Sequence, residues 1–251
     1  MKSLEDILLE RRTIRKYSAE DIDDVTLNAI LEMGCRASTT GNMQVYSIIV
    51  TRDDEMKKRL APFHFNQKMI VEAPVTLTFC ADFNRFNKWC RLRNAEPGYD
   101  NFLSFVTAAI DAIIVAQTVA IAAEAKGLGI CYLGTTTYTA NGIIEALSLP
   151  AGVVPVTTVT LGWPAECPEQ VDRLPLNAVV HSEVYKDYSA DDINQYYAAK
   201  ELRQDSLKYI AENNKETLAQ VFTDVRYKNA DNIHFSNTLL SVLKNQDFFN
   251  Q

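Results

Sequence analysis

Four basic residues lie within six positions near the N-terminus, in the stretch Arg11-Arg12-Thr13-Ile14-Arg15-Lys16. Arginine guanidinium groups form paired hydrogen bonds with phosphate oxygens and keep their charge when water is removed. One interpretation is therefore a cluster that binds a phosphate. The alternative is a set of cations that complements the dipole at the C-terminal end of a helix, and by residue composition alone this alternative is favoured.

Two further stretches combine hydroxyl side chains with glycine next to a predicted strand. Ser38-Thr39-Thr40-Gly41-Asn42-Met43-Gln44 precedes one strand, and Tyr132-Leu133-Gly134-Thr135 ends another. Hydroxyl groups and loop amides in the first stretch could hold ligand oxygens, and a glycine at a strand end lets the backbone approach a flat ligand. Ordinary turn formation is the alternative for both stretches. Arg173, in a loop flanked by prolines, is by default an exposed charge.

The motifs of several enzyme classes are absent from the 251 residues. There is no GxSxG or GxxxxGK[ST] stretch, and Gly127-Leu128-Gly129 lacks the third glycine of a dinucleotide-binding fingerprint. The three histidines and five cysteines show neither the spacing of zinc ligands nor a histidine near a cysteine. These absences argue against serine hydrolases, P-loop proteins, simple dinucleotide-binding domains, metal enzymes and cysteine nucleophiles.

Overall composition narrows the partners and the compartment. Lys and Arg number 25 and Asp and Glu number 32, which gives a net charge of −7. An acidic chain is a poor general binder of nucleic acid or anionic membranes, because both attract basic surfaces. An odd number of cysteines without a CxxC pair predicts reduced thiols. Glu5 and Asp6 interrupt any apolar signal-peptide core, so a cytoplasmic protein is predicted.

The stretch from Phe105 to Ala123 is almost entirely apolar and is long enough to suggest a membrane span. It contains Asp111 and Gln117, and it ends through Glu124 and Lys126 at a glycine, which is typical of an ordinary helix end. We therefore expect a helix buried in a large core or against a second subunit.

Periodicity and β-branched runs predict strands interspersed with helices, and hence an α/β or α+β layered domain. The composition changes beyond Pro175, and the last sixty or so residues are polar and rich in Asn and Lys. We expect a main domain over residues 1–180 and a helical C-terminal extension over 181–251 that wraps the domain or a partner subunit. Helices are expected at about 4–12, 24–36, 56–60, 67–71, 82–93, 101–126 and 141–147, and strands at 45–51, 75–81, 130–133 and 153–161.

Taken together, these stretches are similar in type and order to motifs of the nitroreductase superfamily. The run from Arg11 to Tyr17 resembles its RRS-I-R-x-[FY] opening, and Ser38 to Gln44 resembles its Ser/Thr-rich flavin loop. The resemblance extends over about residues 1–200 and points to the branch of NADPH-dependent nitroreductases and flavin reductases. The other matching stretches, in order, are Gln67-Lys68, Cys80-Ala81-Asp82, Ala122-Ala123-Glu124, Gly127-Leu128-Gly129, Tyr132-Leu133-Gly134 and Leu161-Gly162-Trp163-Pro164.

The resemblance implies a three-layer α+β fold, with a mostly antiparallel sheet covered by helices, and a noncovalent FMN at the interface of a homodimer. In that family the arginines hold the phosphate or the polar edge of the flavin, hydroxyl groups contact ribityl and phosphate oxygens, and some contacts come from the partner chain. Gln67 would bond to the pyrimidine edge, and a backbone amide among residues 133–135 would lie beside N5. The residues carried over are Arg11, Arg12, Thr13, Arg15, Ser38, Thr39, Thr40, Asn42, Gln67, Leu133, Gly134, Thr135 and Arg173.

The implied activity is the reduction of nitroaromatics, quinones or free flavin by NADPH or NADH, with ping-pong hydride transfer. FMN supplies that chemistry, so no catalytic side chain and no metal are expected. The expected partners are a second copy of the chain and a small-molecule electron acceptor, with no nucleic acid and no membrane. A flavin-binding sensor or carrier without turnover and a cofactor-free helical dimer are the alternatives.

Two positions depart from the family pattern. Relatives often carry a basic residue two positions before the arginine at Arg173, and this chain has Val171 there. Some relatives grip the 2′-phosphate of NADPH with an arginine after a Tyr-Tyr pair, and here Tyr196-Tyr197 is followed by Lys200. Because lysine lacks the paired donors of arginine, the expected preference for NADPH is weakened.

Overall fold

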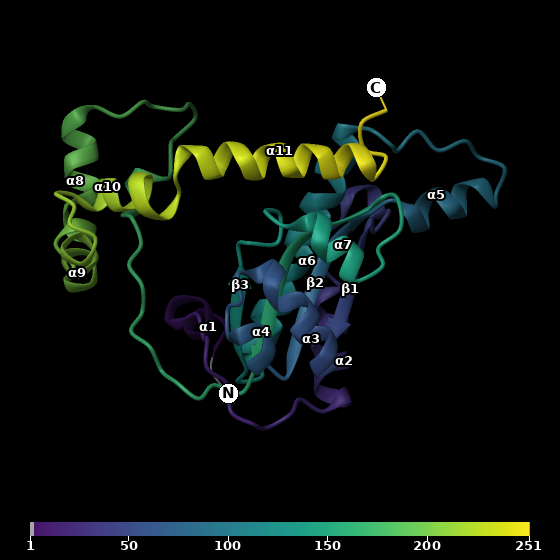
Figure 1. The fold of residues 1–251 in the computed structure, drawn as a ribbon, viewed down its shortest axis with the longest axis horizontal. Coiled ribbons are helices and arrows are strands. Elements are labelled where there is room, and N and C mark those ends of the chain that lie inside the picture. Colours follow the sequence, from purple (N-terminus) through teal and green to yellow (C-terminus); the bar gives the residue numbers. More distant parts are fainter. Residues whose placement is uncertain (1–2, 251) are drawn as a thin grey trace. The chain divides into compact units, whose positions relative to one another are not determined.

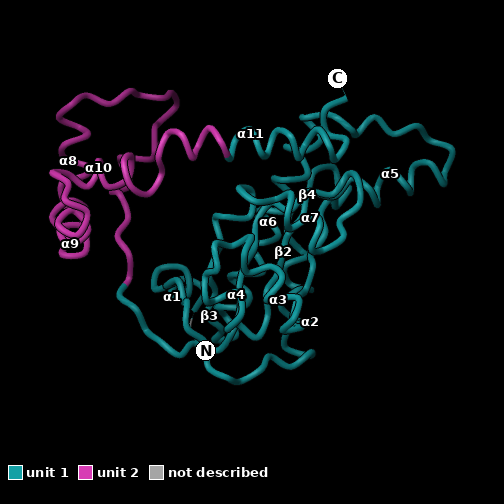
Figure 2. Tube along the Cα trace, in the orientation of Figure 1, with its two compact units in different colours: residues 1–169, 235–251 teal, residues 170–234 magenta. Residues whose placement is uncertain are grey.

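A computed structural model describes residues 3–250, which divide into two compact units. The first unit runs to Glu169 and takes up the chain again from Phe235, and the second comprises Gln170–His234 (Figure 2). The C-terminal residues thus return to the first unit. The predicted division into a main domain at 1–180 and an extension at 181–251 stays a prediction. The two compact units do not show which segments fold together.

The first unit is built on an antiparallel sheet (Figure 1). Its order is β1 (Tyr46–Thr51), β2 (Val75–Asp82), β4 (Val153–Gly162) and β3 (Gly129–Leu133), and every neighbouring pair is antiparallel. All eight residues of β2 are buried, as expected of a central strand covered on both faces. The α+β class and the mostly antiparallel sheet predicted from the sequence are confirmed.

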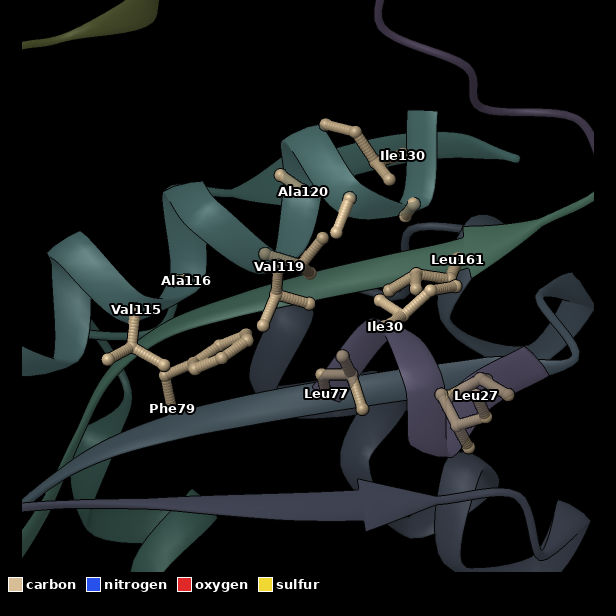
Figure 3. Packing of buried hydrophobic residues seen from close by; sticks show 14 of the residues in the cluster. Leu27, Ile30, Leu77, Phe79, Val115, Ala116, Val119, Ala120, Ile130 and Leu161 are labelled. Carbon is tan, nitrogen blue, oxygen red and sulfur yellow. The ribbon is translucent and has the colours of Figure 1, made fainter. Parts of the chain in front are cut away.

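The long apolar stretch forms α6 (Phe102–Ala125), which packs against the sheet and against α2 (Asp24–Gly34). By length and composition α6 is apolar enough to cross a membrane, yet one of its faces lies in the main hydrophobic core. The helices approach closely, since a Cβ on Gly34 would lie 2.1 Å from Val119 Cγ2. Figure 3 labels the residues of this contact: Leu27, Ile30, Leu77, Phe79, Val115, Ala116, Val119, Ala120, Ile130 and Leu161.

The remaining elements of the first unit lie within a few residues of their predicted positions. The clearest difference concerns Asp82, which was expected to open a helix and instead ends β2. Its carboxylate accepts hydrogen bonds from the Ser47 hydroxyl and, at 3.2 Å, from the Arg85 N–H, so it joins the strand to the next helix. The other helices are α1 (Leu4–Glu10), α3 (Asp54–Leu60), α4 (Met69–Glu72), α5 (Asn84–Arg91) and α7 (Ala140–Ala146).

The secondary structure of the second unit is helical. It contains α8 (Ala190–Glu201), α9 (Gln204–Glu212) and α10 (Leu218–Val221), and α11 (Asn229–Asn245) begins in it. No residue of α8 is buried, so local polar contacts carry much of the order. The C-terminal end of α11 contributes Val242 and Leu243 to a hydrophobic cluster of the first unit.

Candidate functional site

The basic cluster follows α1 as extended chain along the sheet. Thr13 forms a parallel bridge with Ile130 of β3, and the Ile14 N–H donates to the Ile130 carbonyl at 3.0 Å. Further on, Tyr17 bridges Pro164, just beyond β4. No basic residue lies in the last turn of α1, but Arg12 donates to the carbonyl of Glu10, the last residue of that helix, at 3.3 Å. Stabilisation of the helix end therefore accounts for Arg12 and leaves Arg15 and Lys16 unexplained. Pairing with β3 places the cluster beside the sheet.

Glu166 fixes the backbone of this segment. Its Oε1 accepts hydrogen bonds from the N–H groups of Arg15 at 2.8 Å and Lys16 at 3.1 Å. The Ala165 N–H donates to the Lys16 carbonyl at 3.0 Å, which adds a second connection. Because the carboxylate binds main-chain amides, the side chain of Arg15 stays exposed to solvent.

Arg11 and Arg12 line a cavity of about 550 Å³ between α1, the start of β3 and residues 164–167. Arg11 Nε lies 3.5 Å from Glu124 Oε1. Burial raises the pKa of the Glu124 carboxyl, and Arg11 partly opposes that shift. Arg12 Nε is buried and has no hydrogen-bond partner among residues 3–250. A buried cationic donor without an acceptor suits an anionic ligand.

Gly129 allows the basic segment to lie this close to β3. A Cβ at Gly129 would lie 2.6 Å from Ile14 Cβ, a distance that real Cβ atoms essentially never show. We expect Gly129→Ala to lower the free energy of unfolding by about 1 to 3 kcal/mol, because Ile14 must move within a packed site. Denaturant unfolding measures this loss.

Gly134→Ala is the matched control for that substitution, because it lies just beyond the other end of β3 and a Cβ there meets nothing within 4 Å. Equal losses in the two variants would contradict the steric explanation.

The loop from Ser38 to Gln44 connects α2 to β1 through a single 3-10 turn at Thr40–Asn42. Gly41, Asn42 and Gln44 have φ values of 55°, 56° and 54°, in the left-handed region that glycine and asparagine tolerate best. The Gln44 side chain donates to Asn42 Oδ1 at 3.2 Å. The turn interpretation is therefore correct locally, while Ser38, Thr40, Asn42 and Gln44 remain exposed and Thr39 is half-buried.

Two contacts from other elements hold this loop. Asp111 Oδ1 in α6 accepts from the Thr40 N–H at 2.9 Å and from the Thr40 hydroxyl at 3.1 Å. At the other end, the Arg85 guanidinium in α5 donates to the Gln44 carbonyl.

Gln67 and the end of β3 lie in adjoining loops. The fully buried His64 places Nδ1 2.9 Å from the Thr135 hydroxyl, and Thr139 donates to the Phe63 carbonyl. Burial lowers the pKa of His64 to about 4, so the ring is neutral at pH 7. Leu133 and Thr135 are buried, but Gly134 is exposed and faces open space, which leaves its backbone accessible.

The thiols in the sheet are not nucleophiles. Burial raises the pKa of Cys131 in β3, and burial raises that of Cys80 in β2 to about 12. Thiols with raised pKa values stay protonated at neutral pH and react slowly. The groups gathered here offer positive charge, hydroxyl groups and backbone donors, which bind and orient a ligand.

Comparison with known proteins identifies the family. The model of the Nitroreductase family matches residues 8–163. The chain belongs to this family. It is 34% identical over 196 residues to an NADPH-flavin oxidoreductase from Vibrio harveyi, with 78% of this chain and 80% of that protein covered. It is 33% identical to an FMN reductase [NAD(P)H] from Bacillus subtilis, with 84% of each covered.

Solved structures agree with that assignment. A crystal structure of a protein from Bacteroides fragilis superposes with a TM-score of 0.97 at 57% identity and covers 98% of this nitroreductase and 100% of that chain. The NfrA1 nitroreductase from B. subtilis gives a TM-score of 0.87 at 26% identity, over 99% of this chain and 100% of its own.

Within one chain of this nitroreductase, the residues expected to contact the flavin do not all lie together. Glu124, beside Arg11, and Asp111, beside Thr40, are thirteen positions apart on α6, which corresponds to about 20 Å along the helix axis. The loop at 38–44 and the arginines are therefore anchored at separate places along α6.

Arg173 and Lys200 belong to the second unit. Arg173 donates to the carbonyl of Asp172 at 2.8 Å, and Lys200 Nζ lies 3.0 Å from Asp172 Oδ2.

Sequence reasoning did not assign a site role to Glu166, Asp111 or His64, which hold the expected cofactor-binding residues of this nitroreductase in place. A signal existed for Asp111, since a carboxylate in the middle of an apolar helix needs a hydrogen-bond donor or an opposite charge. Glu166 directly follows the Trp163-Pro164-Ala165 stretch, but nothing local points from it to Arg15.

Proposed function

We propose that this nitroreductase is an FMN-dependent NAD(P)H oxidoreductase that transfers two electrons to a small acceptor such as a nitroaromatic, a quinone or free flavin. The observation that carries the proposal is the arginine cluster at the 550 Å³ cavity, with a buried Arg12 donor that lacks an acceptor. Carboxylates also line this cavity, so its fit to a phosphate rests on the guanidinium donors of Arg11 and Arg12 and not on a net positive charge. Two of the relatives named above are an NADPH-flavin oxidoreductase and an FMN reductase.

The donor groups present fit FMN. Arg11, Arg12 and Arg15 would hold the phosphate or the polar edge of the flavin, and Thr13, Ser38, Thr39, Thr40 and Asn42 would contact the ribityl and phosphate oxygens. A role for Arg173, which belongs to the second unit, stays a prediction from the family resemblance. Gln67 would bond to the pyrimidine edge, and the exposed backbone at Gly134 would lie beside the ring. When bound, FMN would supply the hydride chemistry between NADPH or NADH and the acceptor. Cationic groups near the flavin would stabilise its reduced anion.

A homodimer through α6 would complete this site. Ile110 and Ile113 of α6 expose 49% and 51% of their surface although the helix is a core element, and Leu103 and Ile114 are exposed beside them. Apolar exposure of this kind marks an interface. In such a dimer the 38–44 loop of one chain would contribute to the site that holds the arginines of its partner, as the family resemblance implies.

The preference for NADPH or NADH would depend on Lys200, which belongs to the second unit. Lys200 already has its charge compensated by Asp172, so it offers a weaker grip on a 2′-phosphate than a free arginine. We expect both NADPH and NADH to serve as donors, and comparison of their rates tests this expectation. A cytoplasmic location remains a prediction from the sequence.

An absorption spectrum tests the function. The purified protein, as isolated or after incubation with FMN, should show flavin bands, and anaerobic NADPH or NADH should bleach them. Addition of a nitroaromatic or a quinone should restore the bands. A colourless protein that does not take up FMN would contradict the proposal, and bound FMN that both nicotinamides leave oxidised would favour a flavin carrier or sensor.

A further inference from the structure

A buried carboxylate lies in the most apolar helix of the molecule. Asp111 in α6 is 1% exposed. Its Oδ1 receives both donors of Thr40, the N–H at 2.9 Å and the hydroxyl at 3.1 Å. Its Oδ2 is also buried and has no hydrogen-bond partner within residues 3–250. The carboxylate thus forms two hydrogen bonds to one residue and leaves its second oxygen unpaired.

Burial of this carboxylate lowers the stability of the folded protein unless other groups compensate for it. Removing a carboxylate from water carries a penalty of several kcal/mol, and only hydrogen bonds or opposite charges offset it. The neighbouring buried residues of the helix, Ala108, Ala112 and Val115, supply neither. Hydrogen bonds to an ionised acceptor are stronger than those to a neutral one. Asp111 is therefore a strong anchor for Thr40, retained at a cost to the core.

The segment that Asp111 anchors would not hold its shape by itself. Three of the four residues after Thr40 have left-handed backbone conformations, and two of these are not glycine. Such conformations persist only when surrounding contacts fix them. Hydrogen bonds from other elements reach this loop at both ends, from Asp111 to Thr40 and from Arg85 to Gln44, and Met43 between them packs against a hydrophobic cluster.

The geometry points to Asp111 as a positioning residue that holds the flavin loop in its binding conformation and ties that loop to the subunit interface. The tie exists because Asp111 lies between the exposed residues Ile110 and Ile113 of α6, the ridge that we assign to the dimer. This inference rests on the proposed function. It predicts that FMN affinity depends on a residue that is too deeply buried to touch the cofactor.

Titration of FMN into the apoprotein, followed by flavin fluorescence, tests the inference. We expect Asp111→Ala to weaken FMN binding about 10- to 100-fold, through loss of charge-assisted bonds to the loop. Asp111→Asn should fall between Asp111→Ala and the wild type, because an amide oxygen still accepts from Thr40. Ser104→Ala is the matched control, since Ser104 is a buried polar residue of α6 that bonds locally to Asn101.

Sedimentation velocity on the same samples separates positioning from assembly. The Asp111 variants should remain dimers, because the apolar ridge is unchanged. The inference would be wrong if the Asp111 variants dissociate into monomers to the extent that they lose FMN affinity. It would also be wrong if they bind FMN as tightly as the wild type. If Asp111→Ala fails to fold, Asp111→Asn decides. Failure of the wild type to bind FMN would contradict the proposed function, whereas an effect missing only in the variants would contradict the role of Asp111.

Mixed dimers test whether the anchored loop serves the partner's site. An Asp111→Ala chain paired with an Arg15→Ala chain, purified through two different tags, carries one defect per subunit. If the loop of one chain completes the site of the other, both defects fall in one site and the other site regains wild-type affinity. The titration should then show half of the sites tight and half weak. Two sites that are both weakened would overturn the link between the loop and the interface.

Discussion

The wild-type protein will lose stability as the pH falls from about 6.5 to about 4, and a His64→Gln variant will not show this part of the loss. The imidazole is fully buried, and burial lowers its pKa from 6.5 to about 4. Between these values the unfolded chain binds a proton that the folded protein excludes, so stability falls as the pH falls. This lowering of the pKa makes the free energy of unfolding about 3 kcal/mol smaller at pH 4 than at pH 7.

Denaturant unfolding at intervals from pH 7 to pH 4 measures this effect. The quantity to compare is the change in unfolding free energy with pH in His64→Gln relative to the wild type. Carboxylates such as Asp205, whose pKa is lowered by Arg203, contribute equally to both proteins and cancel in that difference. Parallel curves for wild type and His64→Gln would contradict the prediction.

His64 also links this pH dependence to the expected flavin site. Its Nδ1 pairs with the Thr135 hydroxyl, and this contact joins the loop before Gln67 to the end of β3. A protonated ring carries a hydrogen on both nitrogens, and its buried Nε2 has no acceptor within residues 3–250. Proton uptake in the folded protein would therefore leave a buried N–H without an acceptor, which opposes protonation.

Much of the fold follows from local patterns in the sequence. The β-branched run at Ile48-Ile49-Val50 predicted β1, and the apolar stretch ending before Gly127 predicted α6 almost to the residue. These elements were predictable because their signals lie within a few consecutive positions. The antiparallel order of the sheet came only from the family resemblance, since pairing between distant strands has no local signal.

The contacts that shape the candidate site could not be predicted in this way. Glu166 binds the Arg15 amide across 151 positions, and Asp111 and Thr40 are 71 positions apart. The basic cluster illustrates the difficulty, because composition favoured a helix end and the structure shows extended chain beside β3. Residue types gave the chemistry of the site, but the partners of those residues are set by tertiary packing.

Replacing Arg15 with alanine should weaken FMN retention by about one to two orders of magnitude. The backbone of Arg15 is fixed by Glu166, while its guanidinium is exposed and forms no ion pair within residues 3–250. The guanidinium donors are unused by other groups, and because the backbone is already fixed, only the side chain must be ordered when an anion binds. Loss of one charge-assisted contact costs about 1.5 to 3 kcal/mol, and each 1.4 kcal/mol is tenfold in affinity.

Lys16→Ala is the control that separates a direct contact of Arg15 from the general effect of one positive charge. Lys16 is the next residue, is also exposed, and has its backbone held by the same Glu166 oxygen at 3.1 Å. Both variants therefore lower the net charge equally and leave the Glu166 anchor intact. FMN titrations at low and high salt should show a large loss for Arg15→Ala at both salt concentrations, and a small loss for Lys16→Ala that salt removes. Equal losses of FMN affinity in the two variants would show that Arg15 acts only through long-range electrostatic attraction. Unchanged affinity in Arg15→Ala would show that Arg15 does not contact FMN.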